Sequence, residues 1–114
     1  MKTDDASEIH VVLEHPNSLL AMGLAAALRG QSRIRVHLAP TEEAPMDVAI
    51  CDYELGVQRA ALARTGGHPR TSPRVMVVAQ HSREQEVPHA LEKGVHGYLL
   101  AGCSLNELLD AIRA

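Results

Sequence analysis

Continuous apolar runs and amphipathic segments alternate along the chain. Val-Ala-Ile-Cys between Asp47 and Asp52, and Val-Met-Val-Val-Ala at 75–79, are apolar throughout and too short for helices. Such runs are typical of strands buried on both faces of a parallel sheet. Residues 33–38 instead alternate apolar and polar positions, as an edge strand with one solvated face does. The predicted strands span residues 9–13, 33–38, 47–52, 75–79 and 97–100.

A helix is predicted after the first of these strands and another after the third. Leucines, alanines and a glycine recur at helical intervals after Asn17 and Ser18, either of which can cap the helix, and Gly30 can end it. After Asp52, the sequence Tyr-Glu-Leu-Gly-Val is expected to be a loop. A short helix is then predicted over 58–64.

Two further helices are predicted in the last third of the chain. Ser82, with Gln85 in the reciprocal position, can cap the first of them, and Pro88 is expected as its first regular residue. Ser104 and Glu107 form a capping box for the last helix. Its apolar stripe consists of Leu105, Leu108, Leu109 and Ile112.

The order of these elements predicts the fold class. Residues 39–46 contain two prolines and two glutamates, which predicts one turn or an irregular crossover instead of a full helix. Strands that alternate with helices indicate an α/β protein with a parallel sheet. We expect a flavodoxin-like (βα)5 sandwich with strand order 2-1-3-4-5 and a shortened or missing second helix. Asp52 would then lie at the carboxyl edge of the sheet, where ligands bind.

Composition narrows the possible functions. The 114 residues suffice for one domain, expected over 9–114 after a flexible tail at 1–8. A net charge of -3 and the absence of Phe and Trp argue against a basic or base-stacking nucleic-acid surface. No apolar span has membrane length, and the two cysteines, Cys51 and Cys103, fit reduced thiols in a cytoplasmic protein. No glycine-rich loop follows the first strand, which argues against a flavin-type cofactor.

Three stretches of the sequence resemble a known family. They are Ile-His-Val-Val-Leu-Glu-His-Pro-Asn-Ser-Leu-Leu-Ala-Met-Gly-Leu at 9–24, Asp-Val-Ala-Ile-Cys-Asp at 47–52, and Ala-Leu-Glu-Lys-Gly-Val-His-Gly-Tyr-Leu-Leu at 90–100. Together with the final helix they resemble the receiver domain of two-component response regulators of the NarL/FixJ (LuxR-type) family. Receivers of this kind take a phosphoryl group from a histidine kinase onto an aspartate.

The resemblance implies a degenerate phosphorylation site. Asp52 matches the phosphoacceptor aspartate, but His15 and Pro16 stand where the family has the acidic pair that holds Mg²⁺. Ala79 stands at the hydroxyl position and Ala101 at the lysine position. A phosphoryl group on Asp52 would therefore lack the cations and donors that offset its charge. We expect weak or no Mg²⁺ binding, no cofactor and no enzymatic activity.

The same resemblance implies how such a chain works. Tyr98 matches the family's switch aromatic. We expect an atypical receiver that serves as a dimerisation and protein-interaction module of a transcription regulator. The first helix is apolar nearly all round, which favours a homodimer. A histidine kinase is a possible partner if Asp52 accepts a phosphoryl group. DNA would be contacted through a helix-turn-helix domain that this chain lacks.

Several residues at the site allow two interpretations. Asp52 is either phosphorylated or an inherited carboxylate bonded to backbone amides and a neighbouring imidazole. Glu14 and Glu54 either lend carboxylates to a metal ion or are solvated acids of the loops. His15 either pairs with Asp52, which would make the pocket respond to pH, or points to solvent.

Overall fold

Five parallel strands form a sheet in the order β2-β1-β3-β4-β5, as predicted. The computed structural model describes residues 8–39, 46–65, 73–81 and 85–114. The strands are β1 (Ile9–Glu14), β2 (Ile34–His37), β3 (Val48–Cys51), β4 (Arg74–Ala79) and β5 (Gly97–Leu100). All adjacent pairs run parallel. The expected flavodoxin-like α/β architecture is therefore confirmed.

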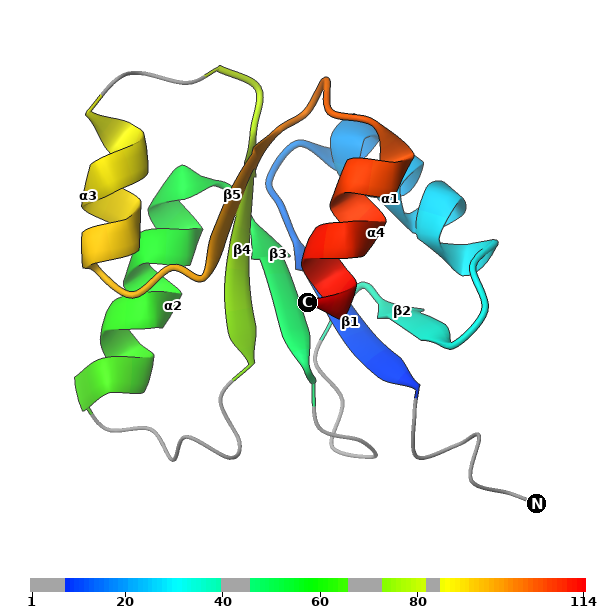
Figure 1. The fold of residues 1–114 in the computed structure, drawn as a ribbon, viewed down its shortest axis with the longest axis horizontal. Coiled ribbons are helices and arrows are strands. Elements are labelled where there is room, and N and C mark those ends of the chain that lie inside the picture. The colour runs from blue at the N-terminus through cyan, green and yellow to red at the C-terminus, as the bar shows by residue number, and fades with distance from the viewer. Residues whose placement is uncertain (1–7, 40–45, 66–72, 82–84) are drawn as a thin grey trace.

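Helices cover both faces of this sheet (Figure 1). They are α1 (Ser18–Arg29), α2 (Tyr53–Thr65), α3 (Glu86–Glu92) and α4 (Leu105–Arg113). Residues of α1 and α4 pack in one hydrophobic cluster, and residues of α2 and α3 pack in the other. The central strand β3 serves both clusters, because Val48 and Ile50 belong to the first while Ala49 and Cys51 belong to the second.

Helix ends follow the capping residues of the sequence. The side chain of Asn17 accepts a hydrogen bond from the backbone N–H of Leu20 at 3.0 Å, and Gly30 is the C-cap of α1. Ser104 and Glu107 form the predicted capping box at the start of α4. After α3, Gly94 adopts a φ of 106°, which glycine reaches without steric cost.

The start of α2 corrects the sequence analysis. Residues 53–57 were predicted as a loop, but α2 begins at Tyr53, directly after β3. Asp52 caps this helix, because its Oδ1 accepts a hydrogen bond from the N–H of Leu55 at 2.9 Å. Its backbone oxygen also accepts the N–H of Gly56 at 2.9 Å. The helix therefore starts five residues before the predicted Gln58.

Two other expectations concern α3 and the crossover into β3. Pro88 is the third residue of α3, not the first, because the helix begins at Glu86. Gln85 is its N-cap but makes no side-chain capping bond. The predicted cap Ser82 and most of the crossover 39–46, where the second helix was expected to be short or missing, lie outside the described residues.

Some apolar side chains of α1 and α4, which share one face of the sheet, are more exposed than the sequence predicts. In α4, Leu108, Leu109 and Ile112 are buried as expected, but Leu105 is 40% exposed. In α1, Ala25 is buried in the core, whereas Leu19 is 81% and Met22 66% exposed. The apolar surplus on α1 therefore lies at the surface of the molecule.

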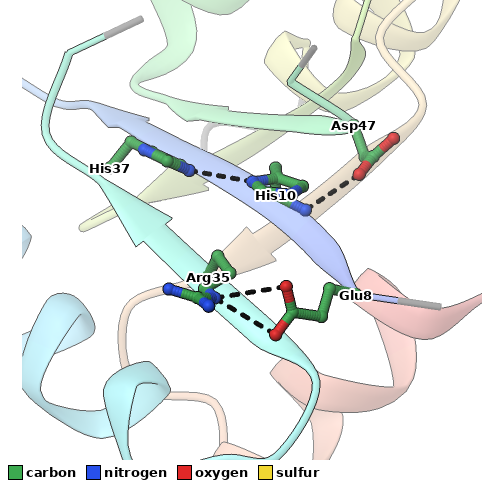
Figure 2. A network of polar contacts seen from close by, with 5 residues as sticks. All are labelled: Glu8, His10, Arg35, His37 and Asp47. Carbon is green, nitrogen blue, oxygen red and sulfur yellow. Dashed lines mark hydrogen bonds and ion pairs between the residues drawn. The ribbon is translucent and has the colours of Figure 1, made fainter. Parts of the chain in front are cut away.

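The other face of β1 and β2 carries polar side chains. His10 and Arg35 are register partners on the two strands and share this face with Val12. Figure 2 shows the resulting network, in which His10 Nδ1 and His37 Nε2 lie 3.0 Å apart and Glu8 pairs with Arg35. Asp47 accepts the backbone N–H of His10 at 2.8 Å. Since α2 packs on β3 and β4, no described helix covers this polar face.

Candidate functional site

Asp52 lies at the carboxyl edge of the sheet, half-buried between β3 and α2. A pocket of about 410 Å³ opens beside it. Among its lining residues are five that the sequence analysis singled out, namely His15, Pro16, Asp52, Glu54 and Ala79. His81, two residues after β4, and Glu86, the first residue of α3, also line it, and neither was predicted from the sequence. The fold therefore brings five of the eight expected site residues together at one pocket.

His15 is held by the backbone and does not pair with Asp52. Its Nε2 lies 2.8 Å from the carbonyl oxygen of Val78, to which it donates. Its Nδ1 lies 3.2 Å from the N–H of Asn17, from which it accepts. Both bonds together require the neutral ring with hydrogen on Nε2. Neither interpretation of His15 holds: the ring links the β1–α1 loop to β4, and it neither pairs with Asp52 nor simply points to solvent.

Glu14 is neither a loop residue nor a solvated acid. It is the last residue of β1 and points to the same face as Val12, towards α2. There its carboxylate forms a two-bonded ion pair with Arg59: Nε donates to Oε1, and Nη2 donates to Oε2 at 2.7 Å. The hydrogen bonding of Arg59 to the Glu14 carboxylate raises the pKa of the Arg59 guanidinium. The Glu14 carboxylate is therefore already paired with a cation that the protein itself supplies.

Arg59 was missed by the sequence analysis. The signal that would have found it is the alternation of side chains along β1, which places Glu14 on the α2 face, together with a basic residue in the helix that follows β3. Those two observations give the sign of the charges but not their distance.

We expect the Glu14–Arg59 pair to contribute about 1–2 kcal/mol of coupling to the free energy of unfolding. The two side chains are 22% and 29% exposed and make two charge-assisted bonds. A double-mutant cycle with Glu14→Gln and Arg59→Gln, measured by urea unfolding, tests this. The Glu8–Arg35 pair is the matched control, because Arg35 is 63% exposed and its coupling is expected to stay below about 0.5 kcal/mol. Equal coupling in the two pairs would contradict the expectation.

The remaining expected site residues lie around the edge of the sheet. Ala101 follows β5 in an exposed turn, and its N–H donates to the carbonyl of Ala79 at 2.8 Å. The two methyl groups thus stand at the ends of neighbouring strands β4 and β5 and supply no charge or hydroxyl. Glu54 is exposed in the first turn of α2.

Tyr98 is half-buried in the cluster beneath α2 and α3. Its hydroxyl donates to Oε1 of Glu86 at 3.4 Å, which connects β5 to the start of α3. Burial, followed by the charge of Glu86, raises the pKa of the Tyr98 phenol. The hydroxyl therefore stays protonated as the donor of this bond near neutral pH.

The two thiols are free and offer no nucleophile. Burial is the main cause that raises the pKa of Cys51 to about 12, and the charge of Glu14 adds to it. The pKa of Cys103 is also raised, by burial and then by Glu107. Reactive cysteines show the opposite shift.

Within the described residues, no group of three His, Cys, Asp or Glu side chains is placed to hold a metal ion. Asp52 contributes a carboxylate at the sheet edge, while Glu14 is bound to Arg59 and His15 to Val78. No helix in the described part of the chain is long and apolar enough to span a membrane.

Comparisons with known proteins identify the fold. No protein-family model and no curated protein matches the sequence. The signal receiver domain of the response regulator NarL from Mycobacterium tuberculosis is 21% identical with a TM-score of 0.71, over 95% of this chain and 98% of that chain. A LuxR-family DNA-binding response regulator from Staphylococcus aureus is 19% identical with a TM-score of 0.74, over 91% and 95% of the two chains.

A third similar structure was solved with a partner. It is the receiver domain of a response regulator from Saccharomyces cerevisiae, crystallised with a histidine phosphotransfer protein. It is 17% identical with a TM-score of 0.70, over 93% of this chain and 87% of that chain. The structural neighbours are thus response-regulator receiver domains, and the chain has their fold.

Proposed function

We propose that this chain is an atypical receiver, a signalling module that acts without Mg²⁺-dependent phosphorylation. The proposal rests on the receiver fold and on one observation above all: the carboxylate nearest to the missing acidic pair, Glu14, is bound by Arg59. In a working receiver the acidic pair, at the positions of His15 and Pro16, holds Mg²⁺ through carboxylate oxygens. Here the Glu14 carboxylate is bound to the Arg59 guanidinium, so it is not free to bind a metal ion.

The charge balance at Asp52 supports the same proposal. A phosphoryl group there would add up to two negative charges at neutral pH. The pocket beside it is lined by a neutral His15, bonded at both ring nitrogens, by the exposed His81, by the methyl group of Ala79 and by the acids Glu54 and Glu86. Ala101 supplies no amine at the position of the family's lysine. The added charge would therefore lack the partners that convert phosphorylation into a movement of α3 and Tyr98.

A homodimer is the second part of the proposal. Leu19, Met22 and Ala26 form an exposed apolar row on α1 at helical spacing. The exposed Leu105 lies on α4, which covers the same face of the sheet. Burial of this surface against a second copy would let the module signal through dimerisation, without phosphorylation. Contact with DNA would come from a separate helix-turn-helix domain.

Phosphorylation of Asp52 by a histidine kinase or phosphotransfer protein is the alternative. Two observations favour it: Asp52 is half-exposed at the sheet edge, and the yeast neighbour was solved with a phosphotransfer protein. In that case Asp52 would accept the phosphoryl group directly, with Tyr98 as the switch aromatic.

Intact mass spectrometry after incubation with acetyl phosphate and Mg²⁺ separates the two functions. We expect no phosphoryl adduct on the natural chain. A variant that restores the family's charges, His15→Asp with Pro16→Asp and Ala101→Lys, is the positive control and is expected to gain an adduct that Asp52→Asn removes. An adduct on the natural chain that is lost in Asp52→Asn would overturn the proposal and establish the alternative.

A further inference from the structure

A second and larger cleft lies on the opposite side of α2 from α3. Its volume is about 830 Å³, and it runs from the carboxyl end of β1 along α2 to the start of β4. On α2, Leu55, Arg59 and Leu62 are spaced at i, i+4 and i+7, so they share one face of the helix and line one wall. Leu38, after β2, and Pro16 line the other wall.

The apolar walls of this cleft are unusually open to solvent. Leu62 is 69%, Leu38 59% and Leu55 37% exposed, although each is a large aliphatic side chain. Three such side chains around one concavity differ from singly scattered apolar residues, which need no explanation. The volume also falls within the range of about 300–1,000 Å³ that is usual for small-molecule sites, which are mostly apolar with a few polar groups.

We propose that this cleft binds an uncharged, largely apolar small molecule. The charged groups among its described lining residues are Glu14 and Arg59, and they neutralise each other in their ion pair. An anionic ligand would have to displace Glu14 from the guanidinium, and a cationic ligand would have to displace Arg59 from the carboxylate. An uncharged ligand leaves the pair intact and gains from covering the three leucines.

The surroundings of the cleft favour a small ligand over a protein helix. The same sheet face continues over β1 and β2 with the polar network of His10, Arg35 and His37. A partner helix lying along this side of α2 would cover these polar groups as well as the leucines, and their burial without new partners is costly. The apolar surface ends where the network begins, which limits the occupant to the length of the cleft.

The proposed site is independent of the chemistry at Asp52. It shares His15 and Pro16 with the pocket beside that residue, so both cavities border the β1–α1 loop. Binding in the cleft requires neither phosphorylation nor its absence.

Fluorescence titration with N-phenyl-1-naphthylamine, an uncharged apolar dye that brightens in apolar sites, tests the proposal. The protein has no tryptophan, which keeps the background emission low. We expect saturable binding of one dye per chain. Leu62→Glu and, on the opposite wall, Leu38→Glu are each expected to weaken binding by about tenfold or more. Leu91→Glu, at a half-exposed leucine on α3 that does not line the cleft, is the matched control and should bind as the natural chain does.

A charged dye with the same rings tests the charge argument. We expect 8-anilino-1-naphthalenesulfonate to bind at least about tenfold more weakly than the uncharged dye. The proposal is overturned if the uncharged dye does not saturate, if both wall variants bind it unchanged, if Leu91→Glu loses it equally, or if the sulfonate binds as tightly. Thermal unfolding of each variant confirms that the fold is retained, which the exposure of all three positions predicts.

Discussion

Replacing Ile112 with alanine is expected to lower the free energy of unfolding by about 2–5 kcal/mol. Ile112 is fully buried in the cluster between the sheet and α1 and α4. Truncation removes apolar contacts and leaves a space that the surrounding strands can fill only in part. Urea unfolding followed by far-ultraviolet circular dichroism measures the loss.

Leu105→Ala is the matched control for this prediction. It removes a similar volume from the same helix, but Leu105 is 40% exposed. We expect a loss below about 1 kcal/mol, because much of this side chain is already in water. Comparable losses in the two variants would mean that the apolar stripe of α4 does not face the sheet as described.

Gly56→Ala is expected to destabilise the protein by about 1–3 kcal/mol, although alanine favours helix. A Cβ at Gly56 would lie 2.6 Å from Cγ2 of Val77 and 3.5 Å from Cγ1 of Val75. Both valines are buried in β4 and branched at Cβ, so they have little room to turn away. The whole first turn of α2 would have to lift from the sheet, and equilibrium unfolding measures the cost.

Gly23→Ala provides the opposite expectation in the same protein. Gly23 lies in α1, and a Cβ there meets nothing within 4 Å. We expect a stabilisation of up to about 1 kcal/mol from helix propensity and from the reduced entropy of the unfolded chain. If Gly56→Ala stabilised the protein as Gly23→Ala does, the close approach of α2 to β4 would be wrong.

The sheet was predictable from sequence because β3 and β4 at its centre are buried on both faces. Continuous apolar runs such as Val48–Cys51 and Val75–Ala79 leave little choice of structure, and their alternation with helices fixes a parallel order. Local capping residues such as Asn17, Ser104 and Glu107 were equally informative, since their hydrogen bonds span only three residues.

The start of α2 was not predictable from the same local rules. A glycine four residues after Asp52 is a common loop signal, and it concealed the N-cap that the aspartate supplies. Gly56 is required by contact with Val77, which lies 21 positions away in the chain. The reason for this glycine is therefore tertiary, and no short window of sequence contains it.

The candidate site was likewise predictable only in part: its residues follow from the sequence, but their hydrogen-bond partners do not. Residue identity, through the resemblance to receivers, singled out Asp52 and the substituted positions around it, and the fold brings several of them together. The hydrogen-bond partners of Glu14 and His15 come from α2 and β4, and their choice depends on distances that the sequence does not give. Neither interpretation of Glu14 or of His15 therefore included the ion pair or the bonded ring of the structure, whereas Glu54 is the exposed acid that one interpretation predicted.

The contact between His10 and His37 has a consequence for the hydrogens of both rings. When both rings are neutral, a single hydrogen lies between His10 Nδ1 and His37 Nε2, so one ring donates and the other accepts. If His10 donates, both rings carry hydrogen on Nδ1; if His37 donates, both carry it on Nε2. Neutral imidazoles on two adjacent strands must therefore share the same tautomer and exchange it together.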